Sequence, residues 1–309
     1  MGTPSPFPPH PSSPRPRPLP IAFLVALRPA QWTKNAFVLA PLVFALRATD
    51  PHSVARATLA LLAFCALASA AYLMNDLFDR ERDRHHPVKR YRPIASGELS
   101  TGAAIAGAMG IGAAGLGACG ALGVAVFACG AAYLALQLLY SRVLKHLPIL
   151  DVFAIAAGFV LRVLSGAAAI SVPVSSWLYL CTLLLALFLA LEKRRAELEL
   201  LQGSASEHRA TLSGYTLPFV DQLVSIVCAC TVLAYALYTL APETIEKFGG
   251  DRLKYTVPFV LFGIFRYLFL VHRRGVGGQP ERVLLVDRVL QADIAAWLAV
   301  VVWAIYARR

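Results

Sequence analysis

The stretch ATLALLAFCALASAAYLMNDLFDRERDRHHPVKRYRPIASG, residues 57–97, joins an apolar run to a dense cluster of charges. Residues 57–74 contain no charged side chain, whereas residues 75–97 carry four acidic and six basic ones. A transmembrane helix needs about 20 mostly apolar residues to cross a hydrocarbon core of about 30 Å. The stretch therefore predicts a membrane-spanning helix that continues into a charged segment at the membrane surface.

The same apolar pattern recurs along the 309-residue chain, which is 58% hydrophobic and 15% charged and has a mean hydropathy of +0.61. Such a composition is typical of a polytopic membrane protein. We predict an all-α membrane protein with about nine transmembrane helices, the first of which begins as an interfacial helix around residues 19–30. Besides 57–74, the expected spans lie near residues 33–47, 100–118, 122–140, 150–170, 174–191, 216–239, 255–271 and 289–306.

Basic residues are unevenly divided between the two sets of connecting segments. If the N-terminus is cytosolic, the cytosolic segments hold 20 of the 29 basic residues and the opposite set holds seven. Because lysine and arginine accumulate in cytosolic loops, we predict a multi-pass protein of the inner cell membrane with its N-terminus and charged loops in the cytosol. The net charge of +11 then reflects loops facing anionic lipid, and no nucleic-acid partner is expected.

The N-terminal segment differs in composition from the rest of the chain. Nine of the first twenty residues are prolines. We expect residues 1–20 to form a disordered basic tail and residues 21–309 to form a single membrane domain.

The charged segment begins with four oxygen-bearing side chains that share one face of a helix. At about 100° per residue from Asn75, Asp76 falls at roughly 100°, Asp79 at roughly 40° and Asp83 at roughly 80°. Carboxylates this close repel one another, and a hard divalent cation relieves the repulsion. An oxygen-only ligand set fits Mg²⁺, which also binds substrate phosphates.

Two interpretations of this acidic face are open from the residues alone. One is local pairing in a solvated helix, with Arg80, Arg82 and Arg84 as the partners. The other is a metal site beside a phosphate site, because a second group of cations follows the break at Pro87. This group consists of Lys89, Arg90 and Arg92.

The pattern Asn75-Asp76-x-x-Asp79-x-x-x-Asp83 resembles the first aspartate-rich motif of the UbiA superfamily of intramembrane prenyltransferases. Several other blocks are similar to the branch of that superfamily that transfers phosphoribosyl groups to decaprenyl phosphate. These blocks are RPAQWTKN (28–35), DRHHPVKRYRPIASG (83–97), YSRVLKHLPILD (140–151), LEKRRAEL (191–198) and GGQPERVLLVDRVLQ (277–291).

The resemblance implies a fold of nine helices around a central cavity. It also implies a Mg²⁺-dependent transfer of 5-phosphoribosyl from phosphoribosyl diphosphate to a polyprenyl phosphate, for making a cell-envelope arabinose donor. Asn75, Asp79 and Asp83 would hold the metal, with Asp76 in support. Lys89, Arg90 and Arg92 would stabilise the departing diphosphate.

The chain departs from most of the superfamily where a second aspartate-rich motif is expected. It has instead Glu192-Lys193-Arg194-Arg195-Ala196-Glu197. Three adjacent cations cannot form a metal cage, but they can bind the additional 5-phosphate of a phosphoribosyl donor. The alternative is a basic loop that only fixes membrane topology.

Further polar residues adjoin the predicted spans. An ionisable residue at membrane depth, such as Arg162, usually faces a cavity or a partner. Asp151 has two open roles, in the site or in a pair with Lys145. The predicted substrate-binding residues are Lys34, Asn35, Tyr140, Lys145, Arg162, Lys193 and Arg194.

Two other functions remain to be weighed against phosphoribosyl transfer. The first is transfer of a prenyl group from a prenyl diphosphate to an aromatic or other small acceptor. The second is transport, which fits less well because the polar residues gather at one membrane face instead of along a pore. The small-residue helix faces allow an oligomer but do not require one.

Overall fold

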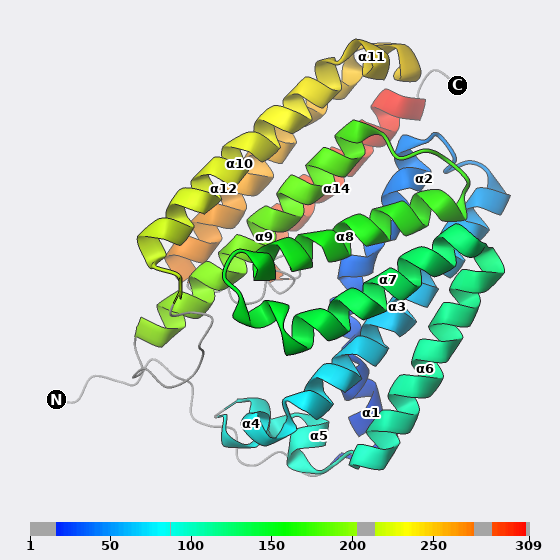
Figure 1. Ribbon diagram of the computed structural model, residues 1–309. Helices are drawn as coiled ribbons and strands as arrows, with labels where there is room; N and C mark the ends of the chain where they lie inside the picture. Colours follow the sequence, from blue (N-terminus) through cyan, green and yellow to red (C-terminus); the bar gives the residue numbers. More distant parts are fainter. Residues whose placement is uncertain (1–16, 87, 203–213, 275–285, 307–309) are drawn as a thin grey trace.

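The computed structural model describes residues 17–86, 88–202, 214–274 and 286–306, in which all regular secondary structure is helical. Residues 1–16 of the predicted tail lie outside this part of the chain. Eight of the described helices are long and apolar enough to cross a membrane, and they lie alongside one another in a bundle (Figure 1). They are α3 (Pro51–Phe78), α6 (Thr101–Leu122), α7 (Val124–Arg142), α8 (Leu150–Ala169), α9 (Ser176–Gln202), α10 (Leu217–Leu240), α12 (Val257–Arg274) and α14 (Arg288–Tyr306).

The first predicted span differs from the expected continuous helix. It consists of α1 (Leu19–Leu27), a long 3₁₀ segment η1 (Pro29–Leu39) and a short α2 (Ala40–Phe44). Pro29 disfavours a helical backbone at the residue before it, and Arg28 accordingly caps α1 with a left-handed φ of 56°. Because α1 and α2 lie at opposite ends of the bundle (Figure 1), the broken segment still runs the length of the other helices.

The charged segment folds into short helices at one end of the bundle. After α3 ends at Phe78, the chain forms α4 (Arg80–His85), η2 (Lys89–Tyr91) and α5 (Pro93–Ser96) before α6 begins. Figure 1 shows α4 and α5 at the end of the bundle opposite to α11 (Pro242–Phe248). The end of α3 therefore presents its carboxylates at the same face as this charged segment.

Close helix packing depends on small residues. A Cβ at Gly115 of α6 would lie 2.8 Å from the side chain of Leu67 on α3. A Cβ at Gly166 of α8 would lie 1.9 Å from the backbone oxygen of Val38 in η1. Glycine is thus required where η1 presses against α8, which contributes residues to both large apolar cores.

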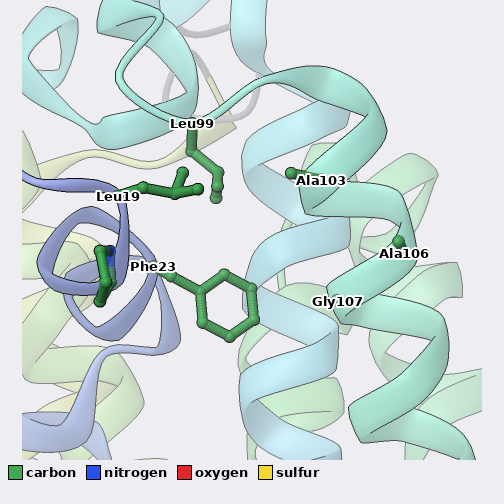
Figure 2. Close-up of a pocket in the computed structure, with 7 residues that line it drawn as sticks. Leu19, Phe23, Leu99, Ala103, Ala106 and Gly107 are labelled. Atoms are coloured by element: carbon green, nitrogen blue, oxygen red, sulfur yellow. The ribbon is translucent and has the colours of Figure 1, made fainter.

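Helix α1 packs against α6 in a similar way. The ring of Phe23 points toward Gly107 (Figure 2), where a Cβ would lie 2.5 Å from the ring. A shallow apolar groove of about 460 Å³ remains between the two helices. It extends over about one turn of each helix, from Leu19 to Phe23 and from Ala103 to Gly107.

At the far end of the bundle, Arg56 of α3 joins the ends of two other helices. Its Nε donates to the Ala169 carbonyl at 2.5 Å, and its Nη2 donates to the Leu122 carbonyl at 2.6 Å. The last carbonyls of a helix have no partner within the helix. One guanidinium therefore satisfies the C-terminal ends of α6 and α8 together.

Candidate active site

Two carboxylates of the acidic face share one arginine. Asp76 and Asp83 are 3% and 2% exposed, and Arg92 donates from the same nitrogen, Nη1, to Asp76 at 3.1 Å and to Asp83 at 2.6 Å. Arg92 reaches them because the turn from η2 into α5 folds back against α4. The cation predicted to stabilise a leaving group thus lies between two of the predicted acids.

Arg28 is a further partner that we did not predict from the sequence. Its Nη2 lies 2.5 Å from Oδ1 of Asp76, and its guanidinium stacks over Tyr72 at 5.0 Å from the ring centre. A left-handed φ is uncommon for a residue other than glycine and often marks a functional site. The sequence signal that could have identified Arg28 as a site residue was its position at the start of the RPAQWTKN block.

The third acid, Asp79, pairs with a residue from a different loop. The Nζ atom of Lys145 donates to both carboxylate oxygens of Asp79, at 2.9 and 3.2 Å. The nearest local contact to Asp79, from Arg82, is 4.0 Å long. Local pairing therefore does not account for the acidic face: Asp76, Asp79 and Asp83 all have closer partners from beyond α4.

The other residues predicted near the metal occupy different positions. Asn75 is half-buried at the end of α3, and Lys89 is half-buried on η2. Arg90 is exposed and donates to the hydroxyl of its neighbour Tyr91 at 2.6 Å. Among these predicted cations, Arg92 is the one with a described contact to the buried carboxylates.

A second polar cluster centres on Arg194 of α9. Its three nitrogens contact Asp151 and Glu197, each at 2.5 Å, and the Tyr140 hydroxyl at 2.9 Å. Asp151 is fully buried and also accepts from the Tyr215 hydroxyl at 2.7 Å. Of the two roles considered for Asp151, the pair with Lys145 finds no support in these contacts, since the described partner of Lys145 is Asp79. Asp151 instead holds Arg194 beside Tyr140.

Tyr215 also supports a strained turn before α8. Its hydroxyl accepts from the Ile149 amide at 2.5 Å, and Ile149 has φ 71° and ψ −49°. This conformation is rare for a β-branched residue. Burial raises the pKa of the Tyr215 hydroxyl, and its hydrogen bond to the Asp151 carboxylate raises that pKa further. Tyr215 was not predicted from the sequence and had no local signal.

The neighbours of Arg194 on α9 have separate environments. Arg195 pairs with Asp221 and Glu199, each at 2.6 Å. Lys193 is half-buried. Glu192 is completely buried, and neither of its carboxylate oxygens has a hydrogen-bond partner among the residues that the structure describes. Arg194 and Arg195 therefore each have two acidic partners.

Arg162 and Asn35 meet at membrane depth. Arg162 is 5% exposed and donates to Oδ1 of Asn35 at 2.7 Å and to the Tyr133 hydroxyl at 2.9 Å. Asn35 donates in turn to Sγ of Cys65, at 3.3 Å. Cys65 precedes Asp76 on α3 by about 16 Å of helix, so this cluster is separate from the carboxylates. Nearby, Lys34 donates to Gln31 at 2.7 Å.

The residues at the end of α3 are compatible with a magnesium ion, although not as a complete cage. Within the described residues, no three His, Cys, Asp or Glu side chains are close enough to hold one metal. Mg²⁺ commonly uses one or two carboxylates and takes its other oxygens from water and phosphate. Asp76 and Asp83, already bridged by Arg92, supply such a pair.

The chain is similar in sequence to a known family and to named proteins over most of its length. A family model described as the UbiA prenyltransferase family matches residues 36–285. Decaprenyl-phosphate phosphoribosyltransferase from Corynebacterium glutamicum is 36% identical over 91% of this chain and 86% of that protein. The protein of the same name from Mycolicibacterium smegmatis is 33% identical over 91% of both chains.

The arrangement of the helices is also similar to that of solved structures. A UbiA homolog from Archaeoglobus fulgidus bound to GPP and Mg²⁺ superimposes with a TM-score of 0.70 at 22% identity. The match covers 92% of this chain and 99% of that one. At this identity the likeness establishes the fold, and it agrees with the predicted bundle of about nine helices.

Proposed function

The chain belongs to the UbiA prenyltransferase family, and we propose that it transfers 5-phosphoribosyl from phosphoribosyl diphosphate to the phosphate of a long polyprenyl phosphate. Diphosphate is the other product. The observation that carries the proposal is the sharing of Arg92 by Asp76 and Asp83. Carboxylates that can bind a metal ion are here in direct contact with a cation that can bind phosphate, and a diphosphate donor complexed with Mg²⁺ would use both kinds of group.

The donor would bind at the end of α3. Asp76 and Asp83, with Asn75, would hold Mg²⁺, and Asp79 would join them once it exchanges Lys145 for the metal. When bound, Mg²⁺ neutralises charge on a diphosphate and so improves it as a leaving group. Arg92, Lys89 and Arg90 would contact the diphosphate oxygens. As the C1–O bond lengthens, negative charge moves to those oxygens, and fixed cations stabilise it more than they stabilise the ground state.

The acceptor needs no general base. A polyprenyl phosphate is already anionic, so one of its oxygens can attack C1 as the bond to diphosphate breaks. Attack from the side opposite to the leaving group predicts inversion at C1. Lys145 lies next to Asp79 and is therefore suited to hold either reacting phosphate near the carboxylates.

The second cluster supports a donor with an additional phosphate. Lys193, Arg194 and Tyr140 are the candidates for contact with a sugar phosphate or a lipid phosphate. Asp151 and Glu197 fix the orientation of Arg194, so little side-chain entropy is lost when an anion binds. Lys34, Asn35 and Arg162 stay predicted substrate contacts, and we expect the last two to shape the part of the site within the membrane.

The expected orientation agrees with this chemistry. With the N-terminus and the loops near α4 in the cytosol, the water-soluble donor would reach the carboxylates directly. The lipid acceptor would remain in the bilayer of the inner membrane. One enzyme could then join a polar donor to an insoluble acceptor.

Purified protein in lipid nanodiscs provides the test, with two pairs of substrates. We expect diphosphate release with phosphoribosyl diphosphate and decaprenyl phosphate, and loss of this release in excess EDTA. Geranyl diphosphate with an aromatic acid should give none. The reverse result would refute the proposal and support prenyl transfer, which a structural neighbour bound to GPP keeps as the second candidate.

A further inference from the structure

A second apolar groove, of about 580 Å³, runs between α7, α8 and α9. Figure 1 shows α8 lying between α7 and α9, and α8 packs against both of them. The volume lies within the range of about 300–1,000 Å³ that is typical of ligand pockets, and the groove has no charged lining residue. Its lining residues are Ala132 and Leu136 of α7, Phe153, Ala157, Val160 and Leu161 of α8, and Tyr179 and Leu183 of α9.

The groove extends through much of the membrane thickness. At 1.5 Å per helical residue, Phe153 lies only about 3 Å along α8 from Asp151. Leu183 and Tyr179 lie about 16 and 22 Å along α9 from Arg194. The lining thus begins near the polar end of the bundle and reaches residues about 22 Å away along α9, compared with a hydrocarbon core about 30 Å thick.

The linings of α7 and α9 converge on one polar contact. Tyr140 is the next residue after Ala132 and Leu136 in an i, i+4 series on α7. Arg194, eleven residues after Leu183, is rotated from it by only about 20° on α9. The two helices meet at this level, because Nη2 of Arg194 donates to the Tyr140 hydroxyl at 2.9 Å.

The same end of the groove is connected to the carboxylates. Lys145 follows Tyr140 in the loop after α7, and its ammonium contacts Asp79 at 2.9 Å. An anionic head group at Tyr140 would therefore lie between the apolar groove and the acids of α3. A polyprenyl phosphate has this combination of a long apolar chain and a terminal anion.

We propose that the groove between α7, α8 and α9 receives the polyprenyl chain of the acceptor, with its phosphate at Tyr140, Arg194 and Lys145. This inference rests on the proposed function and adds the route of the lipid. The groove between α1 and α6 (Figure 2) suits a long chain less well, because it extends over only about one turn of each helix.

We expect the groove to act by aligning the bound lipid and not by adding hydrophobic binding energy. Lipid tails are about as apolar as the groove, so moving the chain from bilayer to groove gives little hydrophobic gain. Fixing the chain instead orients its phosphate for attack. Blocking the groove should therefore reduce the use of long acceptors much more than the use of short ones.

The test replaces Leu183 by Trp, which fills the groove at about 16 Å from Arg194. A matched control, Leu233→Trp, adds the same ring at an exposed position on α10. We expect Leu183→Trp to lower kcat/KM for decaprenyl phosphate at least five-fold. Its kcat/KM for geranyl phosphate, too short to reach Leu183, and its KM for the donor should stay within two-fold of the wild type.

Ala157→Phe blocks the groove from α8 and provides a second variant if Leu183→Trp folds poorly. An unchanged preference for the long acceptor in both variants would overturn the proposal. If the wild type phosphoribosylates neither acceptor, the proposed function fails, and the groove is then tested by binding alone.

The binding measurement uses a polyprenyl phosphate with a photoreactive diazirine at its distal end. We expect labelling of α8 or α9 peptides that decaprenyl phosphate competes away. Labelling of α1 or α6 peptides would overturn the assignment. Equal labelling by a diazirine phospholipid, without competition, would identify the groove as a site for bulk lipid and would also overturn it.

Discussion

Lys145 binds both carboxylate oxygens of Asp79, at 2.9 and 3.2 Å, although 66 residues separate the two in the chain. The side chains are 17% and 21% exposed, so water screens the pair only in part. The contact brings the loop after α7 to the end of α3. It thereby joins the second polar cluster to the carboxylates, and both groups would have to exchange partners when a metal and a phosphate bind.

Asp79→Asn should reduce phosphoribosyl transfer at least 100-fold, because an amide keeps the shape but removes the charge that would bind a metal. Turnover in nanodiscs at saturating Mg²⁺ is the measurement. Asp50→Asn is the matched control: Asp50 caps the opposite end of α3, and asparagine caps about as well as aspartate. Equal losses in both variants, or none at Asp79, would contradict the role of Asp79.

Arg56→Met should destabilise the protein by about 1–3 kcal/mol, because the carbonyls of Leu122 and Ala169 lose their donor. Thermal unfolding in detergent measures the loss, and turnover of the folded variant should be unchanged. Arg47→Met, at an exposed position near the same end of the bundle, should leave the melting temperature as it is. Loss of activity without loss of stability would show that Arg56 does more than bind helix ends.

Gly166→Ala should destabilise the fold by about 1–3 kcal/mol or more, because the new Cβ would overlap the backbone oxygen of Val38. Gly110→Ala on α6 meets no atom within 4 Å and should stabilise its helix by about 0.5–1 kcal/mol. The two substitutions are thus predicted to change the free energy of unfolding in opposite directions. A thermal shift in the same direction for both would argue against close packing of η1 on α8.

Tyr215→Phe should cost about 1–3 kcal/mol near pH 8, because Asp151 and the Ile149 amide each lose a partner. The folded-state pKa of Tyr215 is raised above its ordinary value of about 10. The protonated Tyr215 hydroxyl therefore contributes its full stabilisation to the folded state below about pH 10. This stabilisation is lost as the pH rises further toward the folded-state pKa.

The difference in melting temperature between wild type and Tyr215→Phe should accordingly narrow above about pH 10. Tyr255→Phe, which removes the hydroxyl of an exposed tyrosine, is the control and should leave the melting temperature close to that of the wild type. A gap that stays constant to higher pH would mean that the Tyr215 hydroxyl does not titrate with folding.

Much of the fold was predictable because its signals are local. Seven of the eight expected spans besides residues 57–74 correspond to α6, α7, α8, α9, α10, α12 and α14. The remaining one, residues 33–47, was expected to be a regular helix and is instead divided between η1 and the short α2. Its apolar composition predicted a crossing, but its backbone conformation depends on Pro29 and on the contact of Val38 with Gly166.

The sequence by itself determined that α3 is long and apolar enough to span a membrane and that Asp76, Asp79 and Asp83 follow one another closely at its end and in the short helix after it. Span length and helical periodicity are properties of consecutive residues, so they need no knowledge of distant contacts. Only the tertiary structure decided which cations neutralise those acids and which groups hold Asp151. Arg28, Lys145 and Tyr215 come from separate segments, and helix packing, which depends on side-chain shape across the whole bundle, brings them together.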